Sequence, residues 1–215
     1  MTSTDTHPAL DHAARGWHVF PIRERGKQPI VKWREWATTD PAKIAAEFAA
    51  RSCNVGIACG PSRLLVIDED SADAFAKFAA SIGVELPETY TVRTGRGRHF
   101  YFGMPHSVEL GNAEGALKDR GLNVRGVGGY VVAAGSMHAN GTSYVADHPE
   151  RTPAPCPAWL TGALRGPATS TGSSDARGLA AVPEVIRGPR SDAPGQRHDV
   201  LVGYACSLRA RDVPR

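Results

Sequence analysis

The sequence predicts an α+β fold, in which short helices are interspersed with pairs of antiparallel strands. Two observations support this class. Helical runs with a 3.6-residue apolar period are separated by short strand-like runs, and turns that contain glycine join neighbouring strands. The chain has 215 residues, of which 41% are hydrophobic and 22% are charged. These values are typical of a chain that forms one sizeable core and part of a second domain.

Three segments have the pattern of helices. Residues 8–15 stop at a glycine, which commonly ends a helix. Residues 38–51 begin with two candidate caps, Thr39 and Asp40, and then place apolar side chains on one face. Residues 71–83 also carry a helical apolar stripe.

The strand-like segments are shorter and are bounded by glycine, proline or polar clusters. Two of them form pairs: residues 89–104 predict a hairpin with glycines in its turn, and residues 122–126 are predicted to pair with residues 130–136. The remaining predicted strands are residues 17–22, 54–60, 64–70 and 141–146.

Composition changes after the last of these strands. We therefore predict a folded domain over residues 1–165, followed by a linker rich in Gly, Ser, Ala and Pro over residues 166–195. Residues 196–215 regain a helical period, but a single helix of this length cannot bury its apolar face. We interpret it as the start of a truncated helical domain of a longer protein.

Charge and cysteine usage exclude several classes of protein. The formal net charge of +3 is too small to indicate nucleic-acid binding by itself, so any basic surface must be local. No apolar run approaches the ~20 residues that span a membrane, and no signal peptide is visible. The four cysteines lack zinc-site spacing and predict reduced thiols in a cytoplasmic protein: Cys53, Cys59, Cys156 and Cys206.

An acidic pair ends the apolar strand "RLLVIDED" of residues 63–70. Asp68 and Asp70 are alternate residues, so a strand directs both side chains to one face, ~6.6 Å apart, while Glu69 faces the other way. Two like charges on one face repel each other unless a cation lies between them, and Mg²⁺ or Mn²⁺ prefers carboxylate oxygens. The alternative is that the strand simply ends here, with Asp70 or Ser71 capping the next helix.

Three further segments also carry polar side chains in or beside a predicted strand, where they could bind a ligand. In "TGRGRHFYF" a glycine turn precedes Arg98 and His99, and its main-chain amides could approach phosphate oxygens. Asn123 and Arg125 share the polar face of a predicted strand, and Lys27 lies in a loop after another strand. Each group alone is equally consistent with a plain hairpin, an amphipathic strand or a solvated loop.

The order of these motifs is more specific than any one of them. The segments "GWHVFPIRERGKQPIVKW", "LLVIDED", "TGRGRHFYF" and "NVRGVGGYVVAAGSMHANGTSY" together resemble the primase–polymerase (prim-pol) domain of the archaeo-eukaryotic primase superfamily. The likeness is greatest to the bifunctional type found in phage and plasmid replication proteins, and it covers roughly residues 10–160. It implies an antiparallel sheet like that of RNA-recognition motifs, with an N-terminal α/β subdomain beside it.

The resemblance also implies a chemistry. Members join nucleoside triphosphates on a single-stranded DNA template, acting as DNA primase and DNA polymerase, with two Mg²⁺ or Mn²⁺ ions and no zinc. It implies a primer, and a helicase domain in the same full-length chain. Asp68, Asp70 and the position of Asn123 correspond to the metal ligands and catalytic residues of the family. The residues that the resemblance assigns to nucleotide binding are His99, Arg98, Arg125, Ser136, His138 and Lys27.

One departure from the family pattern is Asn123, where members typically have the third metal-binding Asp. Asparagine keeps an oxygen ligand but removes one negative charge, so weaker metal binding and a slower chemical step are expected. The alternative is therefore a non-catalytic module that binds nucleotides or single strands. Its candidate stacking residues are Trp33, Trp36, Tyr101 and Tyr130. A metal-dependent nuclease that uses the same acids is a third hypothesis.

Overall fold

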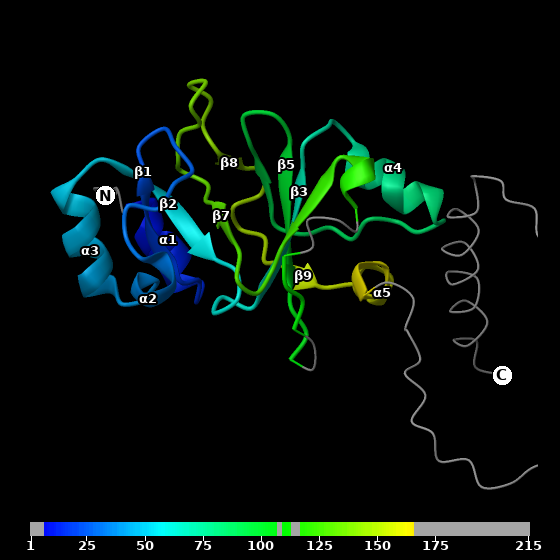
Figure 1. Cartoon of the computed structure of the whole chain (residues 1–215), viewed down its shortest axis with the longest axis horizontal. Coiled ribbons are helices and arrows are strands. Elements are labelled where there is room, and N and C mark those ends of the chain that lie inside the picture. The colour runs from blue at the N-terminus through cyan, green and yellow to red at the C-terminus, as the bar shows by residue number, and fades with distance from the viewer. Residues whose placement is uncertain (1–6, 107–108, 113–116, 166–215) are drawn as a thin grey trace, which may run out of the picture. The chain divides into compact units, whose positions relative to one another are not determined.

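Helices and antiparallel strands are mixed along the chain, which confirms the predicted α+β class (Figure 1). The computed structural model describes residues 7–106, 109–112 and 117–165. The predicted linker at residues 166–195 and the predicted helical fragment at residues 196–215 lie outside the described residues. Within the described part of the chain, no helix has the length and apolar character needed to cross a bilayer.

The three predicted helices are present, although one of them begins later than predicted, and the helices at Trp33–Trp36 and Ala158–Arg165 were not predicted. The Asp40 carboxylate accepts a hydrogen bond from the Ala42 amide at 2.9 Å and caps its helix. The helix predicted from residue 71 begins later, because buried Glu69 accepts a hydrogen bond from the Phe75 amide at 2.9 Å in place of Asp70 or Ser71. The helices are α1 (Pro8–Ala14), α2 (Trp33–Trp36), α3 (Pro41–Ala50), α4 (Ala74–Ser81) and α5 (Ala158–Arg165), with a 3₁₀ turn at Lys118–Arg120.

The strands form two sheets. In the first sheet the order is β1–β2–β7, and in the second it is β6–β3–β5–β4–β8, with β9 parallel to β5. Helices α1, α2 and α3 gather around the first sheet, and α4 lies at the second (Figure 1). The strands are β1 (Val19–Arg23), β2 (Cys53–Ala58), β3 (Leu64–Glu69), β4 (Thr91–Arg93), β5 (Arg98–Gly103), β6 (Leu122–Arg125), β7 (Tyr130–Val132), β8 (Val145–Ala146) and β9 (Ala154–Pro155).

The predicted pairing of residues 122–126 with residues 130–136 is wrong. β6 pairs with β3 in the second sheet, whereas β7 pairs with β2 in the first. The chain crosses between the sheets through "GVGG". Gly128 in this segment has a φ of +82°, a backbone angle that residues with a side chain rarely adopt. This short crossing places the end of β6 in the second sheet close to the start of β7 in the first.

Two clusters of buried apolar side chains hold the layers together. One lies on the face of the second sheet toward the first and includes Phe20, Val66 and Tyr101. The other lies on the opposite face, under α4 and α5, and includes Ile67 and Phe102. Successive residues of a strand face opposite ways, so the central strands β3 and β5 present side chains to both clusters.

Candidate functional site

A row of polar side chains crosses three strands of the second sheet. Asp68 in β3 lies directly opposite His99 in β5 and opposite Asn123 in β6. The His99 Nε2 lies 3.4 Å from Asp68 Oδ1, and Asn123 Nδ2 donates to Asp70 Oδ2 at 2.7 Å. Arg125 follows two residues after Asn123, opposite Val66, and therefore faces the same side. Strand register thus brings together residues that are far apart in sequence.

Asp68 is an ionised carboxylate in a partly buried position. Its side chain is 21% exposed, and that of His99 is 8% exposed. Burial alone would raise the pKa of Asp68, but the hydrogen bond from His99 and the charges of His99, Lys27 and Arg125 outweigh it, so the pKa is lowered. The site therefore holds a negative charge near the positive charges of Lys27 and Arg125.

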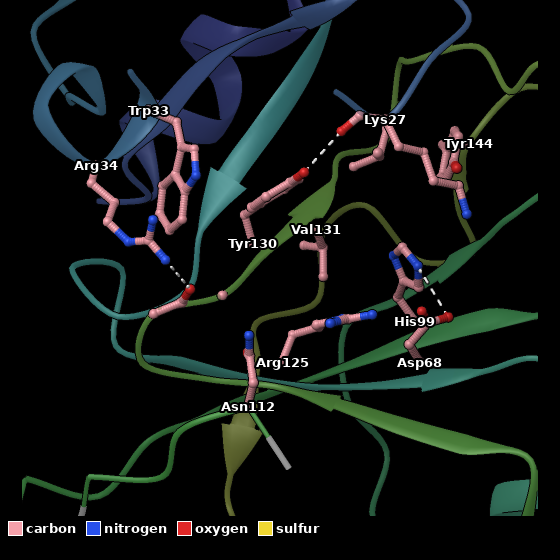
Figure 2. Close-up of a pocket in the computed structure, with 13 residues that line it drawn as sticks. Lys27, Trp33, Arg34, Asp68, His99, Asn112, Arg125, Tyr130, Val131 and Tyr144 are labelled. Atoms are coloured by element: carbon pink, nitrogen blue, oxygen red, sulfur yellow. Dashed lines mark hydrogen bonds and ion pairs between the residues drawn. The ribbon is translucent and has the colours of Figure 1, made fainter. Parts of the chain in front are cut away.

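Two cavities meet at this row and share Lys27, Asp68, His99 and Tyr144. The first, of about 250 Å³, is drawn in Figure 2, where Arg125 reaches toward His99 and Asp68 while Lys27 lies above them. The second, of about 620 Å³, opens on the other side of the pair. Its lining includes Arg23, Glu24, Arg25, Gly26, Gln28, Asp70, Thr94, Arg96, His138 and Ala139.

Buried Asn54 joins two loops that line the second cavity, and sequence reasoning missed it. Its Nδ2 donates to the carbonyl oxygens of Gly26 at 3.1 Å and Met137 at 2.8 Å, and its Oδ1 accepts from the Met137 amide at 2.9 Å. The residues next to these contacts are Lys27 and His138. An asparagine near the start of an otherwise apolar strand was the available signal, because buried polar side chains require partners.

Replacing Asn54 with Leu is expected to lower the free energy of unfolding by about 1–3 kcal/mol, because backbone groups of both loops lose their buried partner. Misplaced loops should also weaken, roughly tenfold, the binding of the nucleotide that the family resemblance predicts for this site. Urea unfolding and nucleotide titrations measure both effects. The matched control is Ser62→Ala, which removes a buried acceptor of the His18 amide at 2.8 Å. It should lower stability without changing nucleotide affinity, and an equal nucleotide affinity of the two variants would contradict a positioning role for Asn54.

Tyr144 is a second residue that the assigned site omitted. It lies in a short hairpin closed by the pairing of Met137 with Ser143, which brings its ring within 6.0 Å of the rings of His99 and His138. Burial, and to a lesser extent the charge of Asp68, raises the pKa of Tyr144 to about 12. Its hydroxyl therefore stays protonated and can donate a hydrogen bond in the cavities.

Arg98 and Ser136 do not join the other predicted nucleotide-binding residues. Arg98 precedes His99 in β5, so it faces the opposite side of the sheet and lines neither cavity. Ser136 is buried, and its hydroxyl accepts a hydrogen bond from the Val55 amide at 3.0 Å. Its position indicates a structural link between β2 and the loop that carries His138.

The amides of the glycine turn are also less available than predicted. Thr94 Oγ1 accepts hydrogen bonds from the Arg96 amide at 3.3 Å and the Gly97 amide at 3.0 Å. A phosphate would have to displace the hydroxyl to reach them. The turn thus satisfies its own amides through the Thr94 hydroxyl and presents its side chains outward.

Of the four candidate stacking residues, Trp33 and Tyr130 line the first cavity described above. The rings of Trp33 and Tyr130 are 5.2 Å apart in an edge-on contact. Tyr101 is fully buried in the core. Trp36 lines neither cavity, and its ring lies under the ammonium group of Lys43, 4.3 Å away.

The acidic end of β3 offers oxygen ligands for a divalent cation. Among the described residues, no group of three or more His, Cys, Asp and Glu side chains is arranged to hold a metal. A cation here would depend on the carboxylates of Asp68 and Asp70 and on the amide oxygen of Asn123. These donors fit Mg²⁺ or Mn²⁺ in chemistry, with one negative charge fewer than three carboxylates would provide.

Comparison with known proteins identifies a family that matches most of the chain. The family described as "Bifunctional DNA primase/polymerase, N-terminal" (Prim-Pol) matches residues 9–159, which include both sheets and every residue of the polar row. No curated protein matches the chain. The match covers most of the sequence, so the chain belongs to the Prim-Pol family of bifunctional DNA primase/polymerase N-terminal domains.

Proposed function

We propose that residues 1–165 form the catalytic domain of a template-dependent nucleotidyltransferase, which joins nucleoside triphosphates on single-stranded DNA. The observation that carries the proposal is the row of Asn123, Asp68 and His99, set in register across three strands, in which Asp68 and His99 line both cavities. Membership of the Prim-Pol family points to DNA and nucleotides as substrates. A phage or plasmid replication protein with a helicase domain is the context we propose.

Separate roles follow for the residues of the site. Asp68, Asp70 and Asn123 would hold Mg²⁺ or Mn²⁺, and bound ions of this kind activate the attacking 3′-oxygen and neutralise charge on the transferred phosphate. His99 fixes the Asp68 carboxylate through their 3.4 Å contact. Lys27, Arg125 and His138 supply positively charged or hydrogen-bonding groups around the cavities, where triphosphate oxygens would lie.

Asn123→Asp tests this assignment, because it adds the missing carboxylate beside Asp68 and Asp70. Without metal, added charge repulsion should lower Tm by roughly 2–4 °C, corresponding to about 1 kcal/mol. With Mn²⁺, affinity should rise about tenfold and nucleotide incorporation should become faster. Thermal unfolding with and without Mn²⁺, and primer synthesis and extension on single-stranded DNA, measure these effects.

The matched control is Asn112→Asp, which places the same charge in the first cavity but away from the end of β3. It should leave Mn²⁺ affinity unchanged. The proposal is wrong if neither the native chain nor Asn123→Asp incorporates nucleotides while Asp68→Ala binds Mn²⁺ as tightly as the native chain.

One observation favours a second function, a non-catalytic module that binds nucleotides or single strands. The Asn123 amide already donates to Asp70 at 2.7 Å, so one of the two carboxylates has a partner without any metal. Trp33 and Tyr130 would then stack on bases at the wall of the first cavity. Metal-independent nucleotide binding that survives Asp68→Asn would support this function over the catalytic one.

A further inference from the structure

We propose that Arg96 and Arg98 form a track for the phosphate backbone of the DNA strand as it leaves the site. The inference rests on the proposed function, because it concerns the DNA on which that function acts. Both residues belong to the hairpin of β4 and β5, whose turn carries "RTGRGR" at residues 93–98. We call the surface made by Arg93, Arg96 and Arg98 the hairpin cluster.

All three arginines of the hairpin cluster are exposed, and the guanidinium groups of two of them have no partner among the described residues. Arg93 is exposed, but its Nε lies 2.5 Å from Asp147 Oδ1 in an ion pair. Arg96 and Arg98 are also exposed, and their guanidinium groups make no ion pair or hydrogen bond with the described residues. Two unpaired guanidinium groups on one surface repel each other, and a phosphate backbone would relieve that repulsion.

The position of Arg96 connects this surface with the proposed catalytic site. Arg96 lines the second cavity together with Asp68 and Asp70. It also lines a neighbouring cavity of about 300 Å³, where Arg93 and Arg98 lie. A strand that occupies the second cavity can therefore pass from Arg96 to Arg98 without leaving a positively charged surface.

The backbone beneath the hairpin cluster is held firmly. Besides the hydrogen bonds to Thr94 Oγ1, the Thr94 amide donates to the Gly97 carbonyl at 2.9 Å. Gly97 lies against the carbonyl of Glu69, and Gly95 lies against the ring of His138, so closely that neither position has room for a Cβ. A fixed turn carries its arginines at defined places, which lowers the entropy lost on binding.

Two considerations favour DNA phosphates over other ligands. The side chain of Arg98 points away from Asp68, so it cannot contact a nucleotide bound at that carboxylate. The acidic residues of the third cavity are Asp73 and Glu69, and Glu69 is buried and engaged with the Phe75 amide. Exposed positive charge thus exceeds exposed negative charge there, as expected for binding through phosphates without base recognition.

The experiment measures how the affinity for a fluorescent oligothymidine depends on salt, with no nucleotide or divalent metal added. For single strands, each lost phosphate contact reduces the slope of log K against log[salt] by about 0.7, so Arg96→Gln/Arg98→Gln should reduce it by about 1.4. Arg98→Lys, which keeps the charge, should retain the native slope. The control Arg51→Gln/Arg120→Gln removes two positive charges elsewhere on the domain and should leave the slope unchanged.

A separate titration with Mn²⁺ and nucleotide distinguishes this inference from the predicted role of Arg98 in nucleotide binding. Arg98→Gln should leave nucleotide affinity unchanged while it lowers the salt slope. The inference is overturned if the double variant keeps the native slope, or if Arg98→Gln weakens nucleotide binding alone. If the native chain binds no oligothymidine, the proposed function fails as well, whereas native binding with an unchanged slope overturns only the track.

Discussion

Replacing Asp68 with Asn is expected to reduce nucleotide incorporation by about 10²–10³-fold. The substitution keeps the shape of the side chain and an oxygen that His99 can donate to, but it removes the charge around which Lys27, His99 and Arg125 are arranged. Loss of a charged ligand to a catalytic cation forfeits several kcal/mol of transition-state stabilisation, and each 1.36 kcal/mol is a factor of ten in rate. Single-turnover primer extension with Mn²⁺ measures the loss.

The matched control is Glu69→Gln, which removes the adjacent carboxylate of the same strand. Glu69 faces α4, where its oxygen caps the Phe75 amide, and glutamine keeps an oxygen acceptor there. Incorporation should change less than about threefold, because no group of the site is removed. If Asp68→Asn and Glu69→Gln lower the rate equally, the carboxylate on the site face has no special role.

Gly97→Ala is expected to give the largest loss of stability. A Cβ at residue 97 would lie 1.7 Å from the Glu69 carbonyl oxygen, and a backbone atom cannot swing aside as a side chain can. Overpacking against movable side chains costs about 1–3 kcal/mol, so a clash between two backbones should reach or exceed the upper value. A loss of 3 kcal/mol corresponds to a decrease in Tm of about 10 °C, which thermal unfolding measures.

A suitable control lies in the strand that follows. Gly103 belongs to β5, has no positive φ, and a Cβ there would come no closer than 3.8 Å to the Ala154 carbonyl oxygen. Gly103→Ala should therefore change stability by less than about 0.5 kcal/mol. A Gly97→Ala variant as stable as Gly103→Ala would show that the turn does not pack against the end of β3.

Much of the site could be predicted because it depends on strand periodicity. Alternation along "LLVIDED" places Asp68 and Glu69 on opposite faces, and the structure has Glu69 against α4 and Asp68 in the cavities. The same rule places Arg98 and His99, which are neighbours in sequence, on opposite faces of their strand. The alternation of side chains along a strand is therefore sufficient to predict which face of the sheet each of these residues occupies.

Other features depend on contacts between distant segments and could not be predicted in this way. The sequence pattern around Gly128 and Gly129 is that of a hairpin, yet β6 and β7 pair with different sheets because long-range partners were available to each. Asn54 acquires its role only when the loops of Gly26 and Met137 meet above β2. Pairing partners of this kind are a property of the whole topology and not of a local window.

Because Asp68 lies directly opposite His99, the site forms only when β3 and β5 pair in the correct register. A slip of β5 by one residue would place Arg98 or Phe100 opposite Asp68, with no change in the amount of sheet. The same slip would also exchange the faces of Tyr101 and Phe102, which are fully buried in different apolar clusters. The packing of the two apolar clusters therefore selects the strand register that the site requires. A chain that paired Asp68 with the wrong residue would also have to move Tyr101 and Phe102 out of the clusters in which they are buried.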